Sequence, residues 1–255
     1  MAGKRKQKKP VESLYQNQVL LLQILYKFRF GTNELLAQYR NITRRTVNKS
    51  ILILLEKGLI DRRYDSVKKI RGESAVYFLT TPGIKYLRTR FTLTDKIVSA
   101  VYKNRIVGEP FINYQLAVFR TYLNLQNQYG DRYDVFTKAE MAKFGQYPEQ
   151  LPDLFLASKN GKNDFMLDIF THEPFFVIKK RIQYYIEHRN EEWDSGQYPS
   201  ILLVCPDARN EDKVIKYTES QLEDFDFLVT TVKALNGGGL EIWSNPVEQD
   251  EPIRL

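Results

Sequence analysis

Two aspartates are spaced so that they could bind a divalent metal ion together. Pro152-Asp153 lies in one predicted strand, and Asp168 lies in the next, fifteen residues later. Adjacent strands can bring two such carboxylates together at one end of a sheet, and Mg²⁺ is a hard cation that prefers oxygen ligands. A metal ion held there could activate water against a phosphodiester. In the alternative interpretation, Asp153 caps or pairs locally and Asp168 satisfies a backbone group at the sheet end.

This arrangement resembles the restriction-endonuclease-like fold, whose sequence motif is Pro-Asp followed, after a spacer, by Asp/Glu-x-Lys. The resemblance covers residues 111–232 and implies a lysine that positions or activates the attacking water. Here Phe170 stands two positions after Asp168, and phenylalanine cannot do this. Lys179 or Lys180, early in the next predicted helix, could replace the lysine if its ammonium reaches back. We therefore favour a catalytically silent copy of the fold over an active enzyme and name Asp153, Asp168 and Lys180 as the catalytic candidates.

Other metal and redox chemistry has little support in the sequence. The chain has one cysteine, Cys205, and two histidines, His172 and His188. A disulfide framework, a thiolate zinc cluster and a tri-histidine site are therefore excluded. His172 could act as a metal or proton partner, but we interpret it as a capping or surface residue. Cys205 lies in an apolar predicted strand, and we expect it to be a small buried hydrophobic residue.

A second set of candidate residues lies on a predicted helix near the N-terminus. Arg45, Asn48, Lys49 and Leu52 follow the helical spacing i, i+3, i+4 and i+7, opposite an apolar stripe that includes Val47 and Leu54. The N-terminal end of a recognition helix enters the DNA major groove, where Arg bonds guanine and Asn bonds adenine. The full set of candidate DNA contacts is Arg44, Arg45, Thr46, Asn48, Lys49, Arg62, Arg63, Lys68, Lys69 and Arg71.

Three helices precede a hairpin in this part of the chain. We predict helices at 14–30, 33–39 and 44–57, with Gly31 and Gly58 ending the first and third, and with Thr32 and Thr43 as caps of the second and third. A tight turn between the second and third helices is the helix-turn-helix layout. Strands at 59–67 and 75–81 enclose a turn that carries Lys68, Lys69 and Arg71, which is a cationic wing. A helix with Ile84, Leu87 and Phe91 on one face then begins at Thr81 or Pro82.

The C-terminal part predicts a mixed sheet with helices on both faces. Its predicted helices lie at 111–128, at 174–189 and from Asn210, as the cap, to about 223. Its predicted strands lie at 133–137, 151–157, 164–171, 200–205 and 227–232, with a short one at 240–243. Phe176 and Ile182 are predicted core positions of the helix at 174–189. The fold class is therefore α+β or α/β. In the segment between the two parts, Thr94 or Asp95 could cap a short helix through Tyr102.

The charge is distributed unevenly along the chain. Residues 1–105 hold 23 Lys and Arg against 7 Asp and Glu, a net +16, whereas residues 106–255 hold 15 against 24, a net −9. Such asymmetry indicates two domains with different partners, the basic one facing a polyanion. We predict a basic disordered tail at 1–13, a winged helix-turn-helix domain at 14–91, a linker at 92–110 and a restriction-endonuclease-like domain at 111–255.

Membrane insertion and secretion are not expected from the sequence. No apolar run approaches the roughly 18 residues of a membrane span, and no apolar stretch of signal-peptide character follows the basic start. We expect a cytoplasmic protein without a membrane partner.

The order of parts resembles the replication-relaxation family of bacterial and mobile-element proteins. The matching features are the run 77–83 (Tyr-Phe-Leu-Thr-Thr-Pro-Gly), Leu116 with Phe119, the run 152–154 (Pro-Asp-Leu), Leu167-Asp168 and the helix from Lys180 to Tyr184. The resemblance implies binding of double-stranded DNA in plasmid or mobile-element replication, transfer or transcriptional control. The missing Asp/Glu-x-Lys motif puts only the nuclease part in doubt.

Three functions remain open at this point. The first is a double-stranded DNA-binding protein whose acidic domain serves a homodimer or another protein partner. The second is a metal-dependent DNA endonuclease that uses Mg²⁺ and is targeted by the winged helix. The third is a protein–protein adaptor.

Overall fold

The computed structural model describes residues 13–64, 70–145, 147–161, 163–189, 193, 197–219, 227–237, 243–245 and 255. Its helices are α1 (Gln16–Phe28), α2 (Asn33–Arg40), α3 (Arg44–Glu56), α5 (Thr81–Arg88), α6 (Asp95–Tyr102), the 3-10 helix η1 (Lys103–Arg105), α7 (Glu109–Tyr129), α8 (Lys138–Met141), α9 (Phe175–His188), α10 (Ala208–Glu219) and α11 (Val232–Asn236). Its strands are β1 (Phe30–Thr32), β2 (Ile60–Arg63), β3 (Val76–Leu79), β4 (Tyr133–Thr137), β5 (Leu154–Ser158), β6 (Phe165–Ile169), β7 (Ser200–Cys205) and β8 (Phe227–Thr231). Among these helices, none has the length and apolar character that crossing a bilayer requires.

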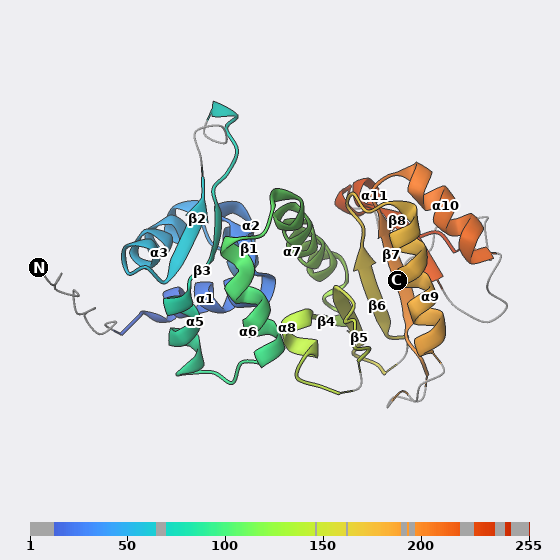
Figure 1. Ribbon diagram of the computed structural model, residues 1–255, viewed down its shortest axis with the longest axis horizontal. Helices are drawn as coiled ribbons and strands as arrows, with labels where there is room; N and C mark the ends of the chain where they lie inside the picture. The colour runs from blue at the N-terminus through green and yellow to red at the C-terminus, as the bar shows by residue number, and fades with distance from the viewer. Residues whose placement is uncertain are drawn as a thin grey trace, which may run out of the picture.

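The strands form two sheets, and the α+β class is confirmed (Figure 1). The smaller sheet has the order β1-β3-β2 and is antiparallel. The larger has the order β4-β5-β6-β7-β8, with β4, β5 and β6 antiparallel and β6, β7 and β8 parallel. Buried residues of α9 and α10 pack with one face of this mixed sheet, and those of α7 and α11 pack with the other.

Threonine caps fix where three N-terminal helices begin. Thr32 Oγ1 accepts a hydrogen bond from Leu35 N, and Thr43 Oγ1 accepts one from Thr46 N, as the sequence predicts. Each bond satisfies a backbone donor that the first helical turn leaves unpaired. Thr80 caps α5 in the same way. The caps therefore orient α2, α3 and α5.

The end of α1 differs from the prediction. Gly31 lies in β1, a strand that the sequence analysis missed, and pairs with Tyr77 of β3. Arg29 takes the positive φ of 68° at the helix end instead. Its guanidinium donates to Asn104 Oδ1 and to Ala100 O, each at 2.8 Å, and these contacts stabilise the turn. The turn between α1 and β1 is therefore stabilised by Asn104, which is 75 positions from Arg29, and the local sequence could not show this contact.

Several boundaries and core assignments also need correction. The sequence predicts Phe176 as a core position, but this residue is 70% exposed. The helix predicted to carry Ile84, Leu87 and Phe91 on one face ends at Arg88, and Phe91 is exposed. Asn210 lies inside α10, and the carboxylate of Asp207 accepts from its backbone N–H, so Asp207 is the capping side chain. The strand predicted at 59–67 corresponds to β2, which ends at Arg63, and residues 65–67 of the prediction lie outside the described residues. The predicted tail 1–13 lies outside the described residues up to its last position, and most of the predicted strand 240–243 does as well.

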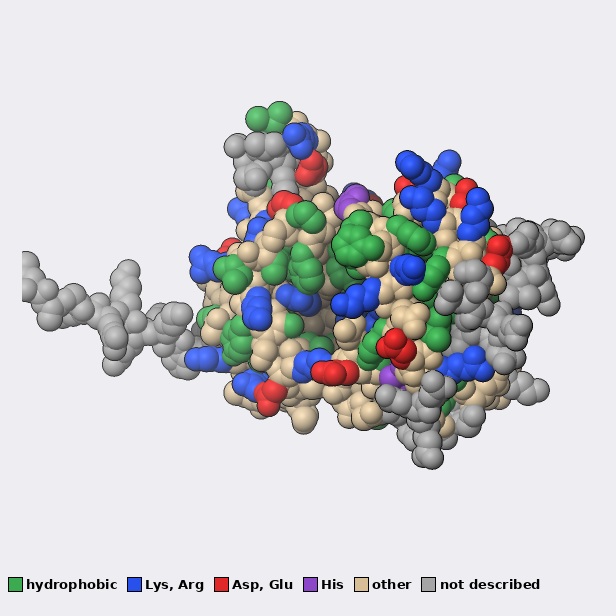
Figure 2. All heavy atoms as spheres, turned by 45° about the vertical axis from the view of Figure 1, so that its right-hand side comes forward, with side chains coloured by type: hydrophobic (Ala, Val, Ile, Leu, Met, Phe, Trp, Pro, Cys, Tyr) green, Lys and Arg blue, Asp and Glu red, His purple; other side chains and the backbone are tan. Residues whose placement is uncertain are grey.

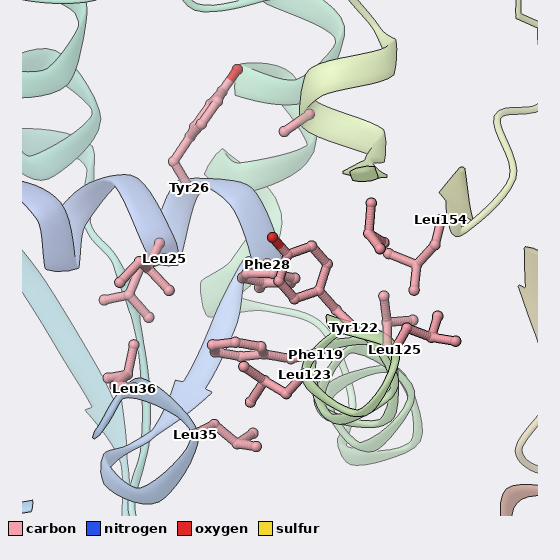
Figure 3. Packing of buried hydrophobic residues seen from close by; sticks show 14 of the residues in the cluster. Leu25, Tyr26, Phe28, Leu35, Leu36, Phe119, Tyr122, Leu123, Leu125 and Leu154 are labelled. Carbon is pink, nitrogen blue, oxygen red and sulfur yellow. The ribbon is translucent and has the colours of Figure 1, made fainter. Parts of the chain in front are cut away.

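One apolar cluster extends from α1 through α7 to the larger sheet. The rings of Phe28 and Phe119 stack with centroids 3.9 Å apart, and Tyr122 packs edge-on against Phe28 at 5.0 Å (Figure 3). The predicted linker contributes α6, whose Val98 and Val101 are buried in the same cluster. The two predicted domains therefore share buried apolar surface.

Lys27 joins the same two parts through polar contacts. Its ammonium donates to Glu140 Oε1 at 3.0 Å and to Tyr122 Oη at 3.2 Å, and lies 4.5 Å from the Tyr122 ring centroid. Lys27→Met keeps the alkyl stem and removes these bonds, so we expect the free energy of unfolding to fall by about 1–3 kcal/mol. Urea denaturation measures this change. Exposed Lys85→Met is the control, and equal midpoints for both variants would contradict the assignment.

Candidate functional site

Helix α3 presents one apolar and one polar face. Its buried residues are Val47, Ile51 and Leu54, and its exposed residues include Arg45, Asn48, Lys49 and Leu52. The predicted division of the faces is therefore confirmed. Leu52 is 63% exposed, so this face combines two cations, an amide and an apolar side chain.

Neighbouring side chains hold parts of this face in place. Asn33 Nδ2 donates to Asn48 Oδ1, and Arg44 Nη2 pairs with Glu34 Oε1. Thr46 Oγ1 lies 2.9 Å from Thr43 Oγ1 at the cap. Asn48 is therefore oriented by α2, and the charge of Arg44 is partly compensated by Glu34.

The hairpin cations have different surroundings from one another. Arg62 is exposed on β2. Arg63, also a candidate DNA contact, donates from Nη2 to the carbonyls of Arg105 and Val107, each at 2.8 Å, so its guanidinium is bound to the chain at and just after η1. Arg71 is exposed, and its Nη1 lies 3.8 Å from Glu73 Oε1. Lys68 and Lys69 lie outside the described residues.

The two aspartates are brought together, as the sequence predicts. Asp153 directly precedes β5 and Asp168 lies in β6, and the two strands pair antiparallel with Leu154 opposite Leu167. The backbone N–H of Asp153 donates to Asp168 Oδ1 at 3.2 Å, and that of Ile169 donates to Asp153 Oδ2 at 2.9 Å. Both carboxylates are buried, Asp153 with 3% exposure.

Two cations that the sequence analysis missed neutralise this pair. Lys138 Nζ lies 2.5 Å from Asp153 Oδ1, and Arg181 pairs with both oxygens of Asp168. Lys180, the predicted substitute for the motif lysine, is exposed. Phe170 is buried in the apolar cluster beneath α9. We call Asp153, Asp168, Lys138 and Arg181, with Tyr114 and Tyr185, the buried charge cluster.

Two tyrosines complete the buried charge cluster. Tyr114 donates to Asp153 Oδ1, and Tyr185 donates to Asp168 Oδ2 at 2.7 Å. Burial, and then the charge of the adjacent carboxylate, raises the pKa of each tyrosine well above its ordinary value. Burial alone would lower the pKa of Arg181, but Asp168, Tyr185 and Asp153 together outweigh burial, and the pKa is raised. The two tyrosines are therefore neutral donors, and Arg181 is a fixed cation.

The buried charge cluster does not fit a divalent metal ion. Each of the four carboxylate oxygens already accepts at least one hydrogen bond. Lys138 and Arg181 supply the two positive charges that a metal ion would bring, so Mg²⁺ would have to displace both. Across the described ranges there is also no group of three or more His, Cys, Asp or Glu arranged for a metal.

A cavity of about 450 Å³ opens beside the cluster, between α6, α7 and α9. Its lining includes Lys96, Tyr114, Lys138, Gln150, Phe170 and Arg181. Figure 2 shows a hollow near the centre of the visible face, with Lys and Arg side chains beside it. The cavity gives solvent access to Lys138, which is 40% exposed, whereas Arg181 is only 12% exposed.

The sequence contained weak signals for the missed residues. Lys138 directly follows β4, whose last residue Thr137 pairs with Leu154, so it falls at the same sheet end as Asp153. Arg181 and Tyr185 are separated by one helical turn on α9. Their convergence on Asp168 became evident only once α9 was packed on the sheet.

Cys205 is buried in β7, and burial raises the pKa of its thiol to about 12. Because the thiolate is the reactive form, we expect no measurable reaction with a disulfide reagent at pH 8 in the native protein. One equivalent should react after unfolding in guanidinium chloride. Rapid labelling of the native chain would show that the strand is open to solvent.

His172 is exposed, and its backbone N–H donates to Glu173 Oε2 at 3.0 Å. This agrees with the interpretation of His172 as a surface residue at the strand-to-helix junction.

Comparison of the chain with protein-family models, with curated proteins and with solved structures finds no match.

Proposed function

We propose that the chain is a double-stranded DNA-binding protein with a winged helix-turn-helix at residues 14–91, in which α3 reads the major groove. The observation that carries this proposal is the outward face of α3, where Arg45, Asn48 and Lys49 are exposed opposite a buried apolar stripe. Arg and Asn provide the bidentate contacts that distinguish guanine and adenine in the major groove, and a lysine contacts phosphate.

The order of the N-terminal elements supports the proposal. The chain runs α1-β1-α2-α3-β2-β3, and β3 pairs with both β1 and β2. In a winged helix-turn-helix, the third helix is followed directly by a hairpin that can reach the DNA backbone. Figure 1 shows the segment 70–75, which leads into β3, projecting from the part of the molecule that contains α3.

The net charge of +16 over residues 1–105 favours DNA over an acidic protein as the partner. The resemblance to the replication-relaxation family supplies the proposed setting, which is plasmid or mobile-element replication, transfer or transcriptional control in the cytoplasm. The C-terminal part would serve assembly, as a homodimer or with another protein.

The test is binding of a labelled duplex of about 30 base pairs, followed by fluorescence anisotropy over a salt series. We expect log K to fall linearly with log salt concentration, because cations that contact phosphates release counterions. Absence of binding at low salt would overturn the proposal and favour the adaptor function.

We further propose that the C-terminal part has the restriction-endonuclease-like architecture without nuclease activity. The observation behind this is that Lys138 and Arg181 take the place of a metal ion. Plasmid incubated with Mg²⁺ or Mn²⁺ should remain uncut by the parent protein. Cleavage by the parent that is lost in Asp153→Ala would contradict the proposal.

A further inference from the structure

A group of cations and aromatic rings that belongs neither to α3 nor to the buried charge cluster lies on α9 and α10. We call it the basic–aromatic ridge. It consists of Phe175, Phe176, Lys179, Lys180, Arg209, Lys213, Lys216 and Tyr217. The half of the chain that contains it carries a net charge of −9, so this local excess of cations differs from its surroundings.

Cation–π contacts between the two helices hold the ridge together. Lys179 Nζ of α9 lies 4.8 Å from the ring centroid of Tyr217 in α10, and Lys213 Nζ of α10 lies 5.9 Å from that of Phe175 in α9. The rings of Phe175 and Tyr217 meet edge to face at 6.3 Å. These crossed contacts place cations from both helices on one surface.

Helical spacing directs the remaining members to the same surface. Arg209, Lys213 and Lys216 follow i, i+4 and i+7 on α10, and all three are exposed. On α9, Lys179 and Lys180 stand three and four positions after Phe176, so they share its side of the helix. Figure 2 shows Lys and Arg side chains gathered at the upper right, with hydrophobic side chains beside them.

Acidic residues on the same helices reduce this charge only in part. The segments 175–188 and 208–219 hold six Lys and Arg against four Asp and Glu, which are Glu187, Glu211, Asp212 and Glu219. Arg181 is one of the six, and it is bound to Asp168. Glu187 accepts from Gln183, and Glu211 is half-buried.

The exposed ring of Phe176 favours single-stranded over double-stranded nucleic acid as the partner. Phe176 is 70% exposed, and Lys179 and Lys180 lie one turn further along the helix. An exposed aromatic ring beside cations is what single-stranded nucleic acid needs, because bases stack on the ring while phosphates contact the cations. In a duplex the bases are already stacked on one another, and the ring would have no partner.

We infer that the basic–aromatic ridge is a second nucleic-acid site, which binds single-stranded DNA through stacking on Phe176 and phosphate contacts with Lys180, Arg209 and Lys216. This site is separate from the duplex site proposed on α3 and does not depend on it.

The test compares a labelled oligothymidine of about 20 nucleotides with a labelled duplex. Phe176→Ala should weaken oligothymidine binding at least fivefold, since stacking contributes roughly 1–3 kcal/mol per base. The triple variant Lys180→Ala, Arg209→Ala, Lys216→Ala should lower the salt slope for oligothymidine by about 2, at roughly 0.7 per phosphate. Lys143→Ala with Lys233→Ala removes two exposed cations elsewhere and should bind oligothymidine as the parent does.

The duplex arm separates this inference from the proposed function. Arg45→Ala with Lys49→Ala should weaken duplex binding and keep the parental oligothymidine affinity, whereas the ridge variants should weaken oligothymidine binding and keep the parental duplex affinity. Parental oligothymidine affinity in both ridge variants would overturn the inference, as would absence of oligothymidine binding by the parent at low salt. Loss of duplex binding alone in the ridge variants would reassign the ridge to duplex phosphates.

Discussion

Replacing Arg45 and Lys49 with alanine should weaken duplex binding at least tenfold. Both side chains lie on the exposed face of α3, opposite buried Val47 and Ile51, so the change leaves the core intact. A bidentate arginine contributes about 1–3 kcal/mol of base discrimination, and tenfold corresponds to about 1.4 kcal/mol. Lys49 adds a phosphate contact, whose loss should flatten the salt slope by about 1. Anisotropy titrations at several salt concentrations measure both effects.

The matched control is Arg120→Ala with Lys233→Ala. It removes one arginine and one lysine from the exposed surfaces of α7 and α11 and causes the same change in net charge. If attraction depended on net charge alone, both double variants would lose the same affinity. That result would show that α3 is not the contact surface.

Arg181→Met should lower the free energy of unfolding by about 3–5 kcal/mol. Removing one partner of a buried ion pair leaves the other charge buried without compensation. This lowers the free energy of unfolding more than replacing both partners with apolar residues would. Arg181 is 12% exposed and Asp168 is 7% exposed, and the arginine also donates to Tyr185 Oη at 2.8 Å. Denaturant-induced unfolding followed by fluorescence measures the change.

Lys180→Met provides the comparison, because Lys180 is adjacent in sequence but exposed. We expect its effect to stay within about 0.5 kcal/mol. Lys138→Met should fall between the two, since solvent reaches its ammonium through the cavity. An Arg181→Met variant as stable as the parent would show that Asp168 is compensated in another way, and a bound cation would then become the leading explanation.

The parts of the fold that follow from local pattern could be predicted from the sequence. The two faces of α3 follow from apolar residues at Val47, Ile51 and Leu54, and the helix caps follow from Thr32 and Thr43. The mixed sheet follows from three strand-like runs succeeded by alternating helices and strands, although the short helix α8 between the first two strands was not predicted. For the helix faces and the caps, the signal and the structure lie within about one helical turn of each other, whereas the sheet follows from the order of elements along the chain.

The parts that depend on distant contacts could not be predicted. Strand β1 exists because Phe30 and Gly31 pair with β3, and the turn before it requires Arg29 to bind Asn104. The Asp153 and Asp168 pair was expected from strand adjacency, but its cations were not. Arg181 contacts Asp168 only because α9 packs on the sheet, and nothing in the spacing distinguishes it from Lys179 or Lys180.

Selection of bound sites from random duplexes at a fixed salt concentration tests most directly whether α3 reads DNA. The parent protein should enrich a defined sequence, and Arg45→Ala should relax the preference at one base position while keeping the others. Asn48→Ala should relax a different position, one that the parent prefers as adenine. Enrichment of the same sequence with the same preferences by all three proteins would contradict the account, and so would the absence of any enriched sequence with the parent.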